Sequence, residues 1–273
     1  MNAISDKFSL KRMWTVVGHY CVANARDLLI RAAVMFGLIF LIALLLTKMV
    51  NEDPVARASM IGLFFVMAAG LLFTVIGSMT FNSYSSKPKR IAAMMLPATK
   101  LEKFLAMSLI YVVFGNIFVL LTLFLSDTLT ASLFGLRSAV SYLPEIFDNI
   151  FYKDPESKRF ILPVSLGIAW FFFMSQAIYL IGSAMWPKLS FLKTFIVINV
   201  FQTVLSIFIP FYHFGDWLGK HFEFFFEYFD NIDKIYALVW SSIAVSYLII
   251  LPGLYALAWL RFRNLAVAKR FLS

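Results

Sequence analysis

Six long stretches of this chain are apolar and contain no Asp, Glu, Lys, Arg or His, which constrains the fold more than any other feature. A helix needs about 20 mostly apolar residues to cross the hydrocarbon core of a bilayer. The stretches cover residues 32–47, 60–81, 104–126, 161–185, 195–211 and 236–260. The first and the fifth are short and reach spanning length only with flanking residues. We therefore expect an all-α integral membrane protein with six transmembrane helices.

The composition supports one membrane domain and argues against a separate soluble domain. Apolar residues make up 61% of the 273-residue chain and charged residues 14%. A soluble domain has about half apolar and about a quarter charged residues. So few charges cannot cover a water-facing globule. We expect a cytoplasmic segment at residues 1–29, a six-helix bundle at 30–260 and a basic cytoplasmic tail at 261–273.

The basic residues predict how the helices are oriented. The N-terminal segment, the second and fourth connections and the C-terminal tail together hold 16 of the 24 lysines and arginines. The opposite face holds 12 of the 15 carboxylates. Because basic connections are retained on the cytoplasmic side, both termini of this multi-pass cell-membrane protein should be cytoplasmic. The net charge of +9 then reflects membrane topology, and we expect no nucleic-acid partner.

An amphipathic helix is expected ahead of the first span, in "KRMWTVVGHYCVANARD" (residues 11–27). At about 100° per residue, the charged side chains keep to one side, and Met13, Trp14 and Val17 lie opposite. Such a helix can lie in the headgroup plane as an interfacial elbow, with its basic side chains reaching into water. It can also pack on the cytoplasmic end of the protein itself. The sequence leaves both interpretations open.

Neutral polar and proline residues within the spans are expected to be structural. Asn116, Gln176, Asn199 and Gln202 are of the type that forms hydrogen bonds between membrane helices, and a role in binding cargo is the less favoured interpretation. Pro252 can interrupt helix hydrogen bonding, and a static kink is a better interpretation than a hinge. Two outer connections, at 126–160 and 213–233, are long enough to hold short interfacial helices.

The sequence offers no enzyme, metal or cofactor site. Cys21 is the single cysteine, so a CxxC metal or redox site cannot form. The three histidines lack the spacing of a metal pair on a helix, and no nucleophile lies near a base. Ion coupling usually requires an ionisable group inside the bundle, so the uncharged stretches disfavour an ion-coupled carrier. If ATP is involved, a separate chain must bind and hydrolyse it.

The connection between the second and third spans has a defined internal pattern, "SSKPKRIAAMMLPATKLEKFL" (residues 85–105). Pro88 suits the first turn of a helix, and Pro97 should end that helix because the residue before a proline leaves helical geometry. Thr99 and Glu102 then form a capping box, in which each side chain accepts a hydrogen bond from the other residue's amide. A new helix should start at Lys100 and continue into the third span.

This pattern has two interpretations that the residues alone leave evenly balanced. Ile91, Met94, Met95 and Leu96 would give the short helix an apolar surface, and methionine adapts well to irregular grooves. With basic residues at its edges, such a helix can dock into a partner. Alternatively, the lysines and arginines only retain the connection on the cytoplasmic side, and the methionines rest on lipid.

The stretch "MMLPATKLEKFLA" (residues 94–106) resembles the LPAS-x-LEKFL signature of ABC-2 type permease-like membrane proteins. Thr99 stands where that signature has serine, a change that preserves the cap. The order of an elbow helix, six spans and a short helix after the second span also resembles this class. The resemblance assigns ATPase coupling to ten residues: Arg90, Ile91, Met94, Met95, Leu96, Pro97, Thr99, Lys100, Glu102 and Lys103.

The resemblance implies the membrane-spanning subunit of an ATP-driven ABC-type exporter in a bacterial inner membrane. It would act as a homodimer or paired permease with a separate ABC ATPase subunit. The alternative is a non-transporting permease-like scaffold or regulatory subunit, which the absence of charged cargo-binding residues also allows. An ion-coupled carrier ranks third, and a membrane enzyme ranks last for want of a site.

Overall fold

The computed structural model describes residues 8–49, 54–134, 138, 141, 161–208 and 232–265, and within these ranges every regular element is a helix. Five runs are long and apolar enough to cross a membrane: Ala25–Met49, Met60–Tyr84, Lys100–Leu133, Ser165–Met185 and Tyr236–Asn264. A shorter apolar helix covers Ser190–Ser206. The expectation of an all-helical, multi-pass membrane protein is thus confirmed. Much of both long outer connections lies outside the described residues.

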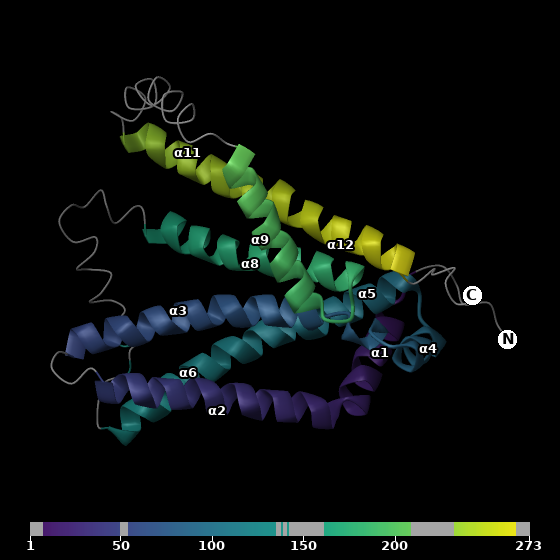
Figure 1. Cartoon of the computed structure of the whole chain (residues 1–273), viewed down its shortest axis with the longest axis horizontal. Coiled ribbons are helices and arrows are strands. Elements are labelled where there is room, and N and C mark those ends of the chain that lie inside the picture. Colours follow the sequence, from purple (N-terminus) through teal and green to yellow (C-terminus); the bar gives the residue numbers. More distant parts are fainter. Residues whose placement is uncertain are drawn as a thin grey trace.

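Most of the long helices lie roughly along one long axis, and a shorter one crosses them steeply (Figure 1). In chain order, the bundle contains α2 (Ala25–Met49), α3 (Pro54–Met79), α5 (Lys100–Ser108), α6 (Gly115–Leu133), α8 (Ile161–Met185), α9 (Ser190–Phe208), α11 (Ile232–Val245) and α12 (Leu251–Leu265). Helix α8 packs against both α3 and α12, and α2 packs against α6. The short helices α1 (Leu10–Ala23) and α4 (Lys87–Met95) gather with α5 at one end of the bundle (Figure 1).

Two of the long helices contain a π-helical segment that the sequence analysis did not predict. One, η2 (Leu109–Phe114), joins α5 to α6, and the other, η5 (Ser246–Ile250), joins α11 to α12. Pro252 follows η5 within the same continuous helix. Because proline has no amide hydrogen to donate, the preceding turn loses a regular hydrogen bond and can widen. Pro252 therefore adjusts the sixth expected span without ending it.

The third span extends further than the uncharged stretch at 104–126. Helix α6 continues to Leu133 and so includes Asp127, of which only 3% is exposed. Ser126 and Thr130 are buried on the same side of the helix. A buried carboxylate was not expected in a spanning helix. Ionisable residues in spanning helices usually face the interior of the bundle, and the burial of Asp127 agrees with that rule.

Helices α3 and α8 approach closely at a glycine, and a hydrogen-bonded pair of polar side chains joins α8 to α6. A Cβ atom at Gly77 would lie 2.7 Å from the Gln176 carbonyl oxygen. Asn116 and Gln176 exchange two amide hydrogen bonds of 2.9 and 2.8 Å, which confirms their expected role between helices. Asn199 instead donates to the Phe195 carbonyl in its own helix, and Gln202 is exposed. The prediction of interhelical bonding is wrong for Asn199 and stays a prediction for Gln202.

Candidate docking site at the α4–α5 corner

Helix α4 begins and ends where the two prolines predict. Ser86 is the extended residue before the helix, and Pro88 lies in the first turn, where its missing amide hydrogen costs nothing. The helix ends at Met95, and Leu96 adopts φ −60° and ψ 130°. This extended geometry is the one that a following proline imposes. The local sequence is therefore sufficient to set both boundaries of α4.

A tight turn and a capping box follow and direct the chain into α5. The Ala98 amide donates to the Leu96 carbonyl at 2.8 Å and closes a three-residue turn around Pro97. Thr99 then caps α5: its amide donates to Glu102 Oε2 at 2.8 Å, and its Oγ1 accepts from the Glu102 amide at 3.3 Å. The predicted capping box and the helix start at Lys100 are confirmed.

Glu102 also ties this corner to the N-terminal helix. Its Oε1 accepts a hydrogen bond from the Ser9 amide at 2.7 Å and from the Arg12 guanidinium at 2.8 and 3.1 Å. The side chain is completely buried. One carboxylate thus accepts hydrogen bonds from amides that have no helical partner at the starts of both α1 and α5. It also pairs with a cation. These bonds hold α1 against α5.

Apolar contacts complete this attachment of α1. Met13, Val16 and Val17 are buried against Ala106 and Tyr111 of the α5–η2 segment. Of the two interpretations of the N-terminal helix, the described contacts agree with packing on the end of the protein. Val22 stays exposed, and about half of Trp14 is exposed although its ring contacts Phe114, so the helix also keeps a partly uncovered apolar surface.

Two basic residues of the predicted site stabilise the corner and do not form its outer surface. Lys103 Nζ donates to the Met94 carbonyl at 3.0 Å, so it satisfies a carbonyl that the end of α4 leaves without a helical partner. The Arg90 guanidinium donates to the Tyr84 carbonyl at 3.3 and 3.1 Å, which fixes α4 to η1 (Asn82–Tyr84). Both ends of α4 are therefore held by side chains.

The outer face of α4 is an apolar ridge with lysines at its edge. Ile91 and Met95 are one helical turn apart, and 39% and 78% of these residues are exposed. Lys87 and Lys89 are exposed in the first turn. This ridge lies outside the five candidate membrane spans. A rigidly held helix with an apolar ridge outside the spans can bind a groove on another protein.

An aromatic cluster beneath the corner links it to the rest of the bundle. Phe104 of α5 stacks on Phe81 with ring centres 5.7 Å apart, and Phe81 lies 4.7 Å from Phe262 of α12. Phe104 also meets Trp259 edge-on at 5.4 Å. Ala93 of α4 packs into the same core, which includes Leu180 of α8. A displacement of α4 would therefore reach α8 and α12 as well as the third span.

The structure divides the ten predicted site residues into an outer surface and an inner framework. Ile91, Met95, Pro97 and Lys100 are exposed. Arg90, Met94, Leu96 and Thr99 are half-buried, and Glu102 and Lys103 are buried. Leu96 packs against the buried side of α1, so it belongs to the framework.

Three features of the site were missed: Arg12, Ser9 and the aromatic cluster. Arg12 and Glu102 are far apart in the sequence, and no local pattern pairs them. A sequence signal existed only for the aromatic cluster, because Trp259 and Phe262 are spaced by three residues on one helix face. No protein-family model, no curated protein and no solved structure matches this chain.

Proposed function

We propose that this chain is the membrane-spanning subunit of an ATP-driven ABC-type exporter, of the ABC-2 permease-like class that its LPATKLEKFL stretch resembles. A separate ABC ATPase subunit would bind the ridge formed by Ile91 and Met95. The exposed ridge on a helix fixed at both ends is the observation that carries this proposal. Movement of an ATPase bound to such a surface would displace the whole α4–α5 corner, because α4 is held at both ends.

The proposal includes the finer topology expected from the sequence. Six spans would cross a bacterial inner membrane, and α1 and both termini would be cytoplasmic. Two copies, or a paired permease, would form the cargo path at their interface. ATP-driven closure of the ATPases would push α4, and the aromatic core would pass the movement to α8 and α12.

The test is co-purification of an ATPase with the full-length, tagged chain from its native host in mild detergent. We expect an ATP-hydrolysing, P-loop-containing protein in the eluate. The double variant Ile91→Asp/Met95→Asp should lower its recovery at least about tenfold, because burying an uncompensated charge in an apolar contact is costly. The matched control is Leu189→Asp, an exposed leucine in the α8–α9 connection with φ 56°, where Asp is tolerated.

Equal recovery of the ATPase with the double variant would contradict docking on this ridge. If the ATPase binds as expected, ATP-dependent movement of cargo into inverted vesicles distinguishes an exporter from a non-transporting scaffold. A scaffold would retain the ATPase and move nothing.

A further inference from the structure

A polar hollow lies where α2 begins, between that helix, η1 and α4. It is a small hollow with an open mouth and a cavity volume of about 30 Å³. Six of the residues that line it carry polar or charged side chains from different elements: Asn24, Asp27, Arg31, Asn82, Ser83 and Lys89. The proposed docking ridge shares only Lys89 with this set, at the edge of that ridge. The hollow is therefore a second candidate site.

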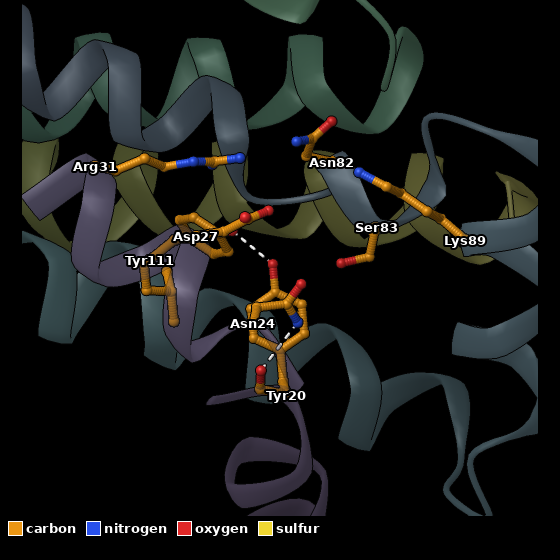
Figure 2. A pocket seen from close by; sticks show the side chains of 9 residues that line it. Tyr20, Asn24, Asp27, Arg31, Asn82, Ser83, Lys89 and Tyr111 are labelled. Carbon is orange, nitrogen blue, oxygen red and sulfur yellow. Dashed lines mark hydrogen bonds between the residues drawn. The ribbon is translucent and has the colours of Figure 1, made fainter. Parts of the chain in front are cut away.

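Two cations converge on this hollow from opposite sides. Figure 2 shows Arg31 and Lys89 extending toward one another, with Asn82 between them. Arg31 makes a weak contact of 3.7 Å with the Met79 sulfur. Within the described ranges, Lys89 has no hydrogen-bond or ion-pair partner. Asp27 is the carboxylate in the lining, so two cations and one anion leave one net positive charge.

Neutral groups add hydrogen-bonding capacity next to these charges. The Ser83 hydroxyl is buried and has no hydrogen-bond partner among the described residues. Buried hydroxyls in folded proteins usually have a partner, so the Ser83 hydroxyl is available to donate a hydrogen bond to a group in the hollow. In the same lining, the hydroxyls of Tyr20 and Tyr111 are hydrogen-bonded to each other at 2.6 Å (Figure 2).

The hollow lies at the end of two candidate spans. Arg31 is near the start of the span Ala25–Met49, and Asn82 and Ser83 are near the end of the span Met60–Tyr84. In the membrane topology proposed above, on which this inference rests, this end of the spans lies at the boundary between hydrocarbon and headgroups. Along α2, Arg31 shares its helix face with Leu38 and Leu45, both exposed. A polar site thus continues into an apolar stripe along the span.

We propose that this hollow binds the phosphate of a membrane phospholipid, with an acyl chain along the Leu38 and Leu45 stripe. A phosphodiester carries a single negative charge, which matches the net charge of the lining. A free phosphate monoester carries about −1.5 to −2 at neutral pH and has no apolar tail to cover the stripe. Arg31 and Lys89 bind the phosphate oxygens, and Ser83 donates its unpaired hydroxyl.

Native mass spectrometry of the full-length protein in detergent, titrated with phosphatidylglycerol, tests this site. The variant Arg31→Gln/Lys89→Gln should weaken lipid binding at least about tenfold, because hydrogen bonds to charged groups are strong. Ser83→Ala should weaken binding about threefold, as expected for one neutral hydrogen bond. The control Arg26→Gln/Lys87→Gln removes the same charge from neighbouring exposed positions outside the lining and should change binding less than twofold.

Inorganic phosphate at millimolar concentration should leave the bound lipid in place. Displacement of the lipid by inorganic phosphate would assign the hollow to a free phosphate and overturn the proposal. Equal weakening in the control double variant would show non-specific attraction to a basic surface, and it would overturn the proposal as well.

Discussion

Arg12 and Glu102 form a salt bridge of 2.8 Å across 90 residues of sequence. Glu102 is completely enclosed, whereas 28% of the Arg12 side chain is exposed. The same carboxylate accepts hydrogen bonds from the Ser9 and Thr99 amides. The start of α1 and the start of α5 therefore share one anion, which ties the α4–α5 corner to the N-terminal helix.

Removing Arg12 should destabilise the protein, because it leaves a buried carboxylate without its cation. Loss of one partner of a fully buried ion pair costs about 3–5 kcal/mol, and the partial exposure of Arg12 lowers our expectation for Arg12→Met to about 2 kcal/mol. Glu102→Gln in the same chain should recover part of this loss, because a neutral amide can still accept from Thr99. Thermal unfolding in detergent, followed by tryptophan fluorescence, measures both changes.

Arg26→Met is the matched control for this experiment, since Arg26 is an exposed arginine in the first turn of α2. We expect its effect on the unfolding temperature to be small. Similar effects of Arg12→Met and Arg26→Met would mean that the salt bridge contributes little to stability. Independent, additive effects of Arg12→Met and Glu102→Gln would contradict a direct interaction between the two residues.

The cap at Thr99 should contribute measurably to the start of α5. Thr99→Ala removes the hydroxyl that accepts from the Glu102 amide, and loss of such a cap costs about 1 kcal/mol. Thr99→Ser keeps the hydroxyl and should keep the stability within a few tenths of a kcal/mol. The free energy of unfolding in denaturant distinguishes the two variants. Equal losses would point to the threonine methyl group instead of the cap.

The α4–α5 corner was predictable because its signals are local. Pro88 and Pro97 act on their own turns, and Thr99 and Glu102 act across three residues. Each of these effects depends on backbone geometry that neighbouring residues alone determine. The structure accordingly has the helix boundaries and the capping box where the sequence analysis placed them.

The surroundings of the corner were less predictable because they depend on contacts between distant segments. The positive charge of Lys103 suggested a solvent-facing edge, yet its ammonium group bonds to the Met94 carbonyl. Met94 and Met95 could not be distinguished from the sequence. The orientation of α4 leaves Met95 exposed and Met94 half-buried. Helical periodicity does not specify which distant element will cover a face. The same limit applies to span boundaries, because the expected third stretch ended before Asp127 whereas α6 continues through it.

Replacing one partner of the Asn116–Gln176 pair should destabilise the protein more than replacing both partners. Asn116→Leu leaves the buried Gln176 amide without its partner, at a cost of about 1–3 kcal/mol. The double variant Asn116→Leu/Gln176→Leu removes both polar groups, so its stability should lie closer to that of the natural protein. The unfolding temperatures of Asn116→Leu, Gln176→Leu and the double variant measure this difference.

Asn199→Leu is the control for this pair, because the Asn199 side chain is exposed and bonds within its own helix. Its effect on stability should be slight. A double variant that is less stable than either single variant would contradict the expectation and would give the pair a net stabilising role between α6 and α8.

Gly77 and Gly62 both lie in α3, and alanine should have opposite effects at the two positions. A Cβ at Gly77 would come within 2.7 Å of the Gln176 backbone oxygen, whereas a Cβ at Gly62 meets no atom within 4 Å. Gly77→Ala must push α3 away from α8, and overpacking of this kind costs about 1–3 kcal/mol. Gly62→Ala should stabilise the helix by about 0.5–1 kcal/mol, because alanine loses less backbone freedom on folding. Unfolding temperatures that shift in the same direction for both variants would contradict close packing between α3 and α8.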